Sequence, residues 1–150
     1  MRKFYFIIFT FLFQLNYAQS NRNLEETKTY IVKMINDYGW IEKSNTKRLV
    51  ATFEGDLIQI GTMNEDYTKR LTNGSLYNFA SVYKMKGPIR KPGEVGLLII
   101  WLDYLSYQGI WKKCSLEMDI HNYEVAEQLR IAFRHLNNLL IENKSKVEQF

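Results

Sequence analysis

The sequence has few of the residues that support a fold covalently or through a metal ion. Its 150 residues include one cysteine, two histidines and two prolines. A single cysteine cannot form a disulfide within the chain, so packing alone must hold the fold, even in an oxidising compartment. The histidines and the cysteine do not follow the spacing of a zinc motif. A chain of this length predicts one domain whose core is large enough to fold without such supports.

The sequence also lacks a long apolar run. About 20 apolar residues are needed to cross a bilayer as a helix. The candidate stretches, residues 4–15 and 95–102, are both shorter than that. We therefore expect no transmembrane segment in the mature chain.

Residues 1–18 have the features of a secretory signal peptide. Two basic residues come first, an apolar run follows, and a small residue, Ala18, ends the segment. This order is typical of a leader that is removed on export. We predict cleavage between Ala18 and Gln19, which leaves residues 19–150 as a single domain in the periplasm or in the medium.

Positive charge is not concentrated in the mature chain. Two of the 20 basic residues leave with the leader and none of the 16 acidic residues does, so the mature net charge is +2. A nucleic-acid surface needs more basic residues, clustered on one face. We therefore expect no nucleic-acid partner.

The end of the chain carries the clearest helical pattern. Across residues 122–143, apolar side chains recur at steps of three and four, with polar residues between them. This period predicts an amphipathic helix whose apolar stripe needs a partner surface. Asn122 can cap its first turn. The stripe consists of Val125, Leu129, Ala132, Phe133, Leu136, Leu139 and Leu140.

A first helix is predicted over residues 21–38. Asn23 and Glu26 have the spacing of a capping box, with asparagine in the serine position. Gly39 is predicted to end this helix in a left-handed conformation.

Between the two helices the apolar period changes to two, which predicts strands. The predicted strands cover residues 49–53, 57–62, 76–84, 95–102 and 114–120. Glycine-containing pairs at residues 55–56 and 73–74 predict turns, and the polar residues 63–70 predict a loop or a weak strand. Residues 84–93 contain both prolines and predict the clearest loop of the chain.

The predicted fold class is therefore α+β. An N-terminal helix is followed by four to six mostly antiparallel strands and a C-terminal helix packed on the sheet, because strands grouped between terminal helices argue against a parallel sheet.

The order of these segments resembles a group of small exported bacterial proteins of uncharacterised function. The resemblance rests on the helix end at residues 37–39 and on the closing segment 126–136. It implies a compact domain in which curved strands are closed by a C-terminal helix, similar in outline to pleckstrin-homology-like folds, and it implies no catalytic residue. Its most specific positions are Leu129, Ala132, Phe133, His135 and Leu136.

Few residues suggest catalysis or a cofactor. His121 and His135 lie on different predicted elements, so we interpret both as structural and expect no metal site. Asp103 follows the predicted central strand and Asp119 lies near the end of the last one, and carboxylates at neighbouring strand ends could perform acid–base catalysis. The sequence contains no hydrolase elbow, zinc-protease helix, Walker loop or dinucleotide fingerprint. We expect no cofactor.

The single cysteine, Cys114, falls on a predicted strand, and we interpret it as a small buried hydrophobe. The alternatives are an intermolecular disulfide and a reactive thiol. Only Lys112 and Lys113 lie near enough in sequence to lower its pKa.

Two groups of residues suggest a binding surface. Four cations within residues 84–91 could meet anionic head groups or an acidic partner. Four aromatic residues within residues 101–111 could line a groove for a glycan or a peptide, since flat rings give a large contact area at little entropic cost. The alternatives are a solvated loop for the cations and core packing for the rings. The cations are Lys84, Lys86, Arg90 and Lys91, and the aromatic residues are Trp101, Tyr104, Tyr107 and Trp111.

These features favour a non-enzymatic exported domain that binds an envelope protein or an amphipathic ligand. The first alternative is a small hydrolase that uses carboxylates at strand ends. The second is a structural subunit whose exposed strand edge pairs with a partner. The sequence favours no particular oligomeric state.

Overall fold

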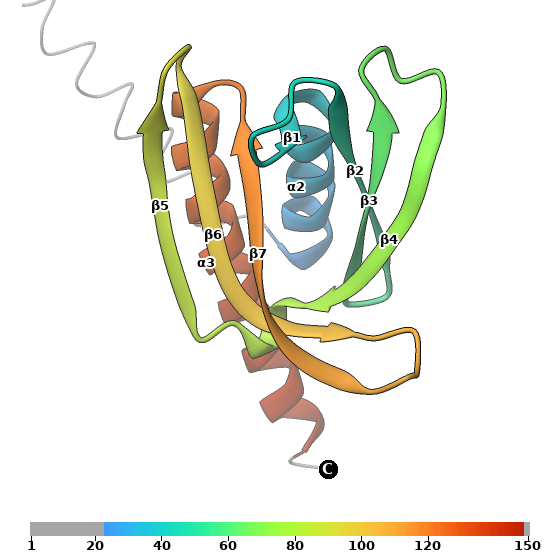
Figure 1. Cartoon of the computed structure of the whole chain (residues 1–150). Coiled ribbons are helices and arrows are strands. Elements are labelled where there is room, and N and C mark those ends of the chain that lie inside the picture. Colours follow the sequence, from blue (N-terminus) through green and yellow to red (C-terminus); the bar gives the residue numbers. More distant parts are fainter. Residues whose placement is uncertain (1–22, 149–150) are drawn as a thin grey trace, which may run out of the picture.

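The computed structural model describes residues 23–148 and folds them into a curved sheet with two long helices (Figure 1). In chain order the elements are α2 (Leu24–Tyr38), β1 (Gly39–Ile41), β2 (Lys47–Glu54), β3 (Leu57–Asn64), β4 (Arg70–Asn78), the 3-10 turn η1 (Phe79–Ser81), β5 (Lys84–Lys91), β6 (Val95–Leu105), β7 (Trp111–Ile120) and α3 (Tyr123–Val147). The predicted α+β class is confirmed. The sheet has seven strands, more than the four to six expected, because β1 and β5 join it without an alternating apolar pattern.

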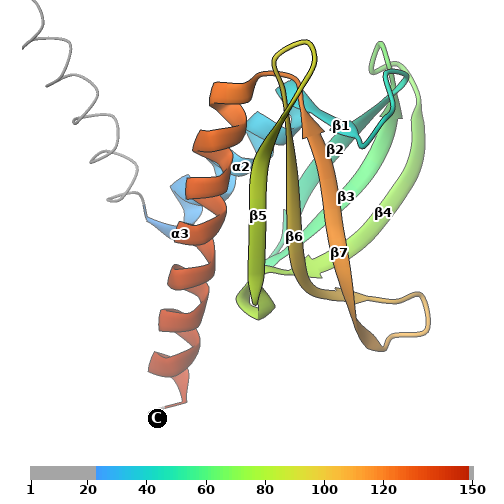
Figure 2. The same cartoon turned by 60° about the vertical axis from the view of Figure 1, so that its left-hand side comes forward.

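The sheet is antiparallel and curls until two of its parts meet. Its strand order is β4-β3-β2-β1-β7-β6-β5, and β4 also pairs with the end of β6. Residues 76–78 of β4 lie opposite residues 103–105 of β6. The first half of β6 pairs instead with β5, which is the free edge of the sheet. The β6–β7 hairpin extends beyond the neighbouring strands (Figure 2).

The C-terminal helix α3 lies along β5 and β6 and covers one side of them (Figures 1 and 2). Asn122 caps its first turn, because the side-chain oxygen accepts a hydrogen bond from the Val125 amide at 3.1 Å. The ring of Phe133 stacks on that of Phe79 with 4.8 Å between the centroids. The prediction of a closing helix packed on the sheet is confirmed, although α3 continues to Val147. Its buried side chains are Ala126, Leu129, Ala132, Phe133, Leu136 and Leu140.

The first helix, α2, begins and ends for different reasons. Its capping box is present, since Asn23 accepts from the Glu26 amide at 2.9 Å and the Glu26 carboxylate accepts from the Asn23 amide at 3.3 Å. The predicted left-handed ending is wrong. Gly39 is extended, with φ of −84°, and its role is steric: a Cβ there would lie 2.6 Å from the carbonyl oxygen of Ile35.

The predicted loop over residues 84–93 is wrong for most of its length. Residues 84–91 form β5, because the apolar strand β6 offers them a hydrogen-bonding partner. Both Gly87 and Pro88 are accommodated at an irregularity, where the pairing register shifts between Lys86 and Ile89. Proline is tolerated at such positions on an edge strand.

Two predictions around β4 are also corrected. Residues 73–74 do not form a turn but lie inside β4, where Gly74 has φ of +79° and packs so closely on β3 that a Cβ would lie 1.7 Å from the Ile60 carbonyl oxygen. The strand predicted over residues 76–84 ends at Asn78, whose side chain caps η1. The predicted loop at residues 63–70 shrinks to a short turn, because β3 and β4 both extend into it.

The predicted leader and its cleavage site, Ala18 and Gln19, lie outside the described residues. Within residues 23–148, no helix is both long enough and apolar enough to cross a membrane.

Candidate functional site

The β6–β7 hairpin is a long, well-paired arm. Its strands pair continuously over residues 96–105 and 111–120. Ser106 fastens the turn at the tip: its amide donates to the carbonyl of Ile110 at 2.9 Å, and its hydroxyl accepts from the Ile110 amide at 3.3 Å. Gly109 adopts φ of +75° in this turn, which glycine does without a steric penalty. The tip is therefore an ordered structure.

Three large apolar side chains are exposed at this tip. Tyr107 is 96% exposed, Ile110 is 54% exposed and Trp111 is 44% exposed. Lys112 and Lys113 follow directly and are exposed as well. Single exposed apolar residues are common on protein surfaces, whereas large contiguous apolar patches are typical of contact sites.

The apolar surface continues along the outer face of the hairpin. Successive side chains of a strand point to opposite sides, and every second residue from Leu98 to Leu102 is buried in the core. Trp101 and Leu105 therefore point outward. Trp111 lies opposite Leu105 and shares this face.

Lysine side chains cover the aromatic rings of the outer face. The Nζ atom of Lys84 lies 4.7 Å from the centroid of the Trp101 ring, and that of Lys113 lies 5.4 Å from the centroid of Tyr83. Cations at this distance from a ring are attracted by its negative face. We call the combined region the aromatic–lysine surface; it consists of Tyr83, Lys84, Trp101, Tyr107, Ile110, Trp111, Lys112 and Lys113. Of these, Lys112 lies opposite Tyr104 and therefore points to the other face of the hairpin, so that Lys112 and Lys113 stand on opposite sides of the tip.

The four aromatic residues that the sequence groups together do not line one groove. Tyr107 and Trp111 are exposed at the tip, and Trp101 is half-buried farther along the outer face. Tyr104 points to the other side of β6, where its ring centroid lies 6.4 Å from that of Tyr77. Three of the four therefore contribute to the surface, and Tyr104 packs inside the curl of the sheet.

The four predicted cations are also separated. Lys84 and Lys86 are exposed on β5. Arg90 forms an ion pair with Glu94 at 2.8 Å. Lys91 faces a buried carboxylate, so only the first two remain available for contact with anionic groups.

A buried charge cluster, which the sequence does not predict, joins β5, β7 and the turn after β1. Asp119 is only 4% exposed, and its Oδ2 atom accepts from the Lys91 ammonium at 2.6 Å and from the Lys43 amide at 3.0 Å. Next to it, the His121 ring stacks on that of Trp40 with 4.6 Å between centroids. His121 remains exposed, but partial desolvation lowers its pKa below the ordinary value, and the nearby Asp119 carboxylate opposes this shift. We assign the cluster a structural role, because each group is held by another part of the fold.

The two carboxylates that the sequence suggests as a catalytic pair are not brought together. Asp103 lies opposite Lys113 and Asp119 lies opposite Leu97, so they stand toward opposite ends of the antiparallel hairpin.

A different carboxyl pair does meet: Glu42, in the turn after β1, and Glu117, on β7. Their side chains share a hydrogen bond, which raises the pKa of Glu117 and lowers that of Glu42. The Lys43 ammonium lies 3.4 Å from Glu42. The two glutamates are far apart in sequence, and no spacing pattern signals their contact.

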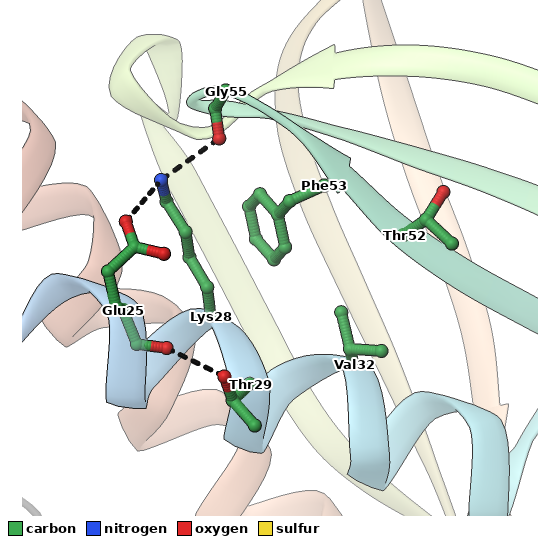
Figure 3. Close-up of a pocket in the computed structure, with 7 residues that line it drawn as sticks. All are labelled: Glu25, Lys28, Thr29, Val32, Thr52, Phe53 and Gly55. Atoms are coloured by element: carbon green, nitrogen blue, oxygen red, sulfur yellow. Dashed lines mark hydrogen bonds and ion pairs between the residues drawn. The ribbon is translucent and has the colours of Figure 1, made fainter.

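A pocket of about 470 Å³ lies between α2 and the β2–β3 hairpin (Figure 3). Its polar wall is Lys28, whose ammonium donates to the Gly55 carbonyl at 2.9 Å, to Asp56 at 2.8 Å and to Glu25 at 3.1 Å. Burial lowers the pKa of Lys28, but the hydrogen bonds to Asp56 and Glu25 outweigh it and hold that pKa above its ordinary value. The ammonium thus stays charged and its three protons are engaged, so it joins the helix to the hairpin. Phe53 forms the apolar wall.

Residues 23–148 contain no group of three or more histidine, cysteine or acidic side chains placed to hold a metal ion. His121 lies just before α3 and stacks on Trp40, and His135 lies within α3.

Cys114 is half-buried on β7, and burial raises the pKa of its thiol, which makes it less reactive.

No protein-family model, no curated protein and no solved structure matches this chain. The resemblance to small exported proteins therefore stays a prediction.

Proposed function

We propose that the chain is an exported, non-enzymatic binding module that contacts an envelope protein or an amphipathic ligand through the aromatic–lysine surface. The observation that carries the proposal is the exposure of Tyr107, Ile110 and Trp111 together at the tip of an ordered hairpin. The predicted leader supports the exported location.

The exposed tip has no role in the fold that would explain its composition. The turn is fastened by backbone and serine hydrogen bonds, which any polar residue at position 107 would leave intact. An almost fully exposed Tyr107 ring gains nothing from burial within the chain. Contact with another molecule would remove this apolar surface from water, which is favourable by roughly 25 cal/mol for each Å² buried.

The lysines give the surface a preference for a negatively charged partner. Lys112 and Lys113 directly follow Trp111 and point to opposite faces of the hairpin, and Lys84 lies farther along the outer face with Lys113. Exposed cations of this kind attract anionic groups and speed association, and salt weakens both effects. An apolar tip flanked by cations thus suits an amphipathic partner with negative charge.

The two alternatives gain less from the geometry. The separation of Asp103 and Asp119 leaves the hydrolase without its proposed pair. The free edge strand β5 carries four cations and Pro88, and lysine and proline on an edge discourage pairing with another strand.

The proposal is tested by photo-crosslinking with the mature chain, residues 19–150. A benzoylphenylalanine replaces Tyr107 in one variant and Ile141 in a matched control, because Ile141 is 49% exposed on α3. The C-terminal end of α3 and the tip of the hairpin lie apart in Figure 2. Each variant is irradiated with an envelope fraction of the source bacterium. We expect adducts from position 107 that unlabelled wild-type chain competes away, and no such adducts from position 141. Equal labelling from both positions, or none from position 107, would refute the proposal.

A further inference from the structure

We infer that the partner of the aromatic–lysine surface is the surface of an anionic lipid bilayer, which the hairpin tip enters to the depth of its three apolar side chains. This inference rests on the proposed function and names its ligand class.

The shape of the tip favours a bilayer over a glycan or a peptide. A small ligand is usually held in a concave site that buries most of its surface. Tyr107, Ile110 and Trp111 are instead exposed in and next to the turn between β6 and β7. The end of this hairpin projects from the sheet (Figures 1 and 2). A convex apolar tip buries its side chains best in a flat surface that yields to it, as the head-group region of a bilayer does.

The residue types at the tip match the chemistry of that region. Tryptophan and tyrosine are enriched where a membrane meets water, because their rings are apolar and each carries one polar group. Tyr107 and Trp111 occupy the two ends of the exposed segment, and Ile110 between them adds an aliphatic side chain. Within residues 23–148 no helix could cross the membrane, so the contact is peripheral and reversible.

The cations lie at the height where lipid phosphates would be. A strand advances about 3.3 Å for each residue, so Lys112 and Lys113 follow Trp111 by roughly one and two such steps. Each lysine near an anionic membrane strengthens binding about fivefold. Asp103 lies opposite Lys113 in the ladder and offsets part of its charge, so we expect Lys112 to contribute more than Lys113.

The test is flotation of the mature chain, residues 19–150, with two kinds of vesicle. This chain contains every helix and strand described, and it lacks the apolar leader, which would itself bind lipid. One kind of vesicle is phosphatidylcholine alone, and the other is phosphatidylcholine mixed with phosphatidylglycerol. We expect the chain to float with the mixed vesicles and to float at least about tenfold less with phosphatidylcholine, since at least two lysines contribute. Equal binding to both, or no binding to the mixed vesicles, would overturn the inference.

Matched variants locate the contact. Trp111→Ser and the double variant Lys112→Glu, Lys113→Glu are each expected to reduce binding about tenfold or more. The controls on α3, Ile141→Ser and the double variant Lys144→Glu, Lys146→Glu, make similar changes at exposed positions and should bind as the wild type does. If the control changes reduce binding as much as the hairpin changes, the inference is wrong.

A further variant guards against a loss of folding. Trp111→Phe keeps an apolar ring and removes one of the three tryptophans, Trp40 and Trp101 remaining. Vesicle binding should therefore persist while the emission shift on adding vesicles becomes clearly smaller, because the contribution of Trp111 entering lipid is lost. An emission shift that this change leaves undiminished would show that Trp111 does not enter lipid and would overturn the inference.

The two proposals fail separately. If position 107 crosslinks to an envelope protein while the chain ignores anionic vesicles, the lipid assignment falls and the binding module stands. If vesicles bind equally well to the hairpin variants and position 107 gives no adducts, both fall.

Discussion

The substitution Gly96→Ala tests how α3 is seated on the sheet. Gly96 lies on β6 directly beneath the first turn of the helix. A Cβ at this position would lie 2.6 Å from the Cβ of Ala126, 3.0 Å from the Cβ of Pro88 and 3.4 Å from Cδ2 of Tyr123. The first distance is far below a van der Waals contact, so the helix or the strand must move. Overpacking of a close contact costs about 1–3 kcal/mol, and we expect the free energy of unfolding to fall by that amount.

The partner substitution Ala126→Gly makes the experiment specific. Alone, it removes a fully buried methyl group, which costs about 0.8 kcal/mol of stability, and the lower helix propensity of glycine costs about 1 kcal/mol more. It also removes the atom that the new Cβ of Gly96→Ala would strike. The double variant should therefore be more stable than the sum of the single effects predicts, by about 1–2 kcal/mol, which is within the range for residues in contact.

Urea denaturation of the mature chain, followed by circular dichroism, measures the three variants against the wild type. Strictly additive effects, within about 0.5 kcal/mol, would show that Gly96 and Ala126 do not touch. The packing of α3 on β6 would then be wrong.

Three further predictions concern the ionisable groups. Lys28→Met keeps the aliphatic part of the side chain and loses the ammonium. The free energy of unfolding should fall by about 1 kcal/mol, mainly through loss of the hydrogen bond to the Gly55 carbonyl, because Glu25 and Asp56 are largely exposed. An unchanged urea midpoint would contradict this prediction. The lowered pKa of His121 means that the unfolded chain takes up a proton more readily, so stability should fall as the pH drops below about 6.5. His121→Phe keeps the stacking and should lose this part of the pH dependence of Tm; an identical pH profile would refute the assignment. Glu117→Gln should raise Tm at neutral pH, where it removes a like-charge contact while keeping a hydrogen-bonding group, and the gain should vanish in acid, where Glu117 is protonated. The exposed Glu127→Gln on α3 is the control, and an equal gain there would show a general charge effect.

The parts of the fold that the sequence predicts are those fixed by local periodicity. The apolar stripe of α3, the cap at Asn122 and the central strand β6 follow from side-chain patterns within a few residues. The strand β5 does not, because its proline and its lysines form a strand only once β6 offers a partner. The local sequence around Gly74 predicts a turn. The actual role of Gly74, a close approach to β3, depends on a strand that is distant in sequence, so the local pattern could not predict it.

The candidate site likewise has one part that the sequence predicts and another that it does not. The sequence identifies Tyr107 and Trp111 as part of an aromatic group, but alternation alone does not show whether a ring at the end of a strand faces the core or the solvent. Only the folded hairpin separates these exposed rings from Tyr104. The contact between Asp119 and Lys43 joins residues that no local pattern connects, so it could not be predicted.

The most direct test of the aromatic–lysine surface is an NMR titration of isotope-labelled residues 19–150 with membranes of the source organism. If the proposed contact exists, the backbone amide signals of residues 105–113 broaden first. Those of residues 141–147, at the exposed end of α3, should stay unchanged. Broadening that spreads evenly over the chain, or that begins on α3, would contradict the account.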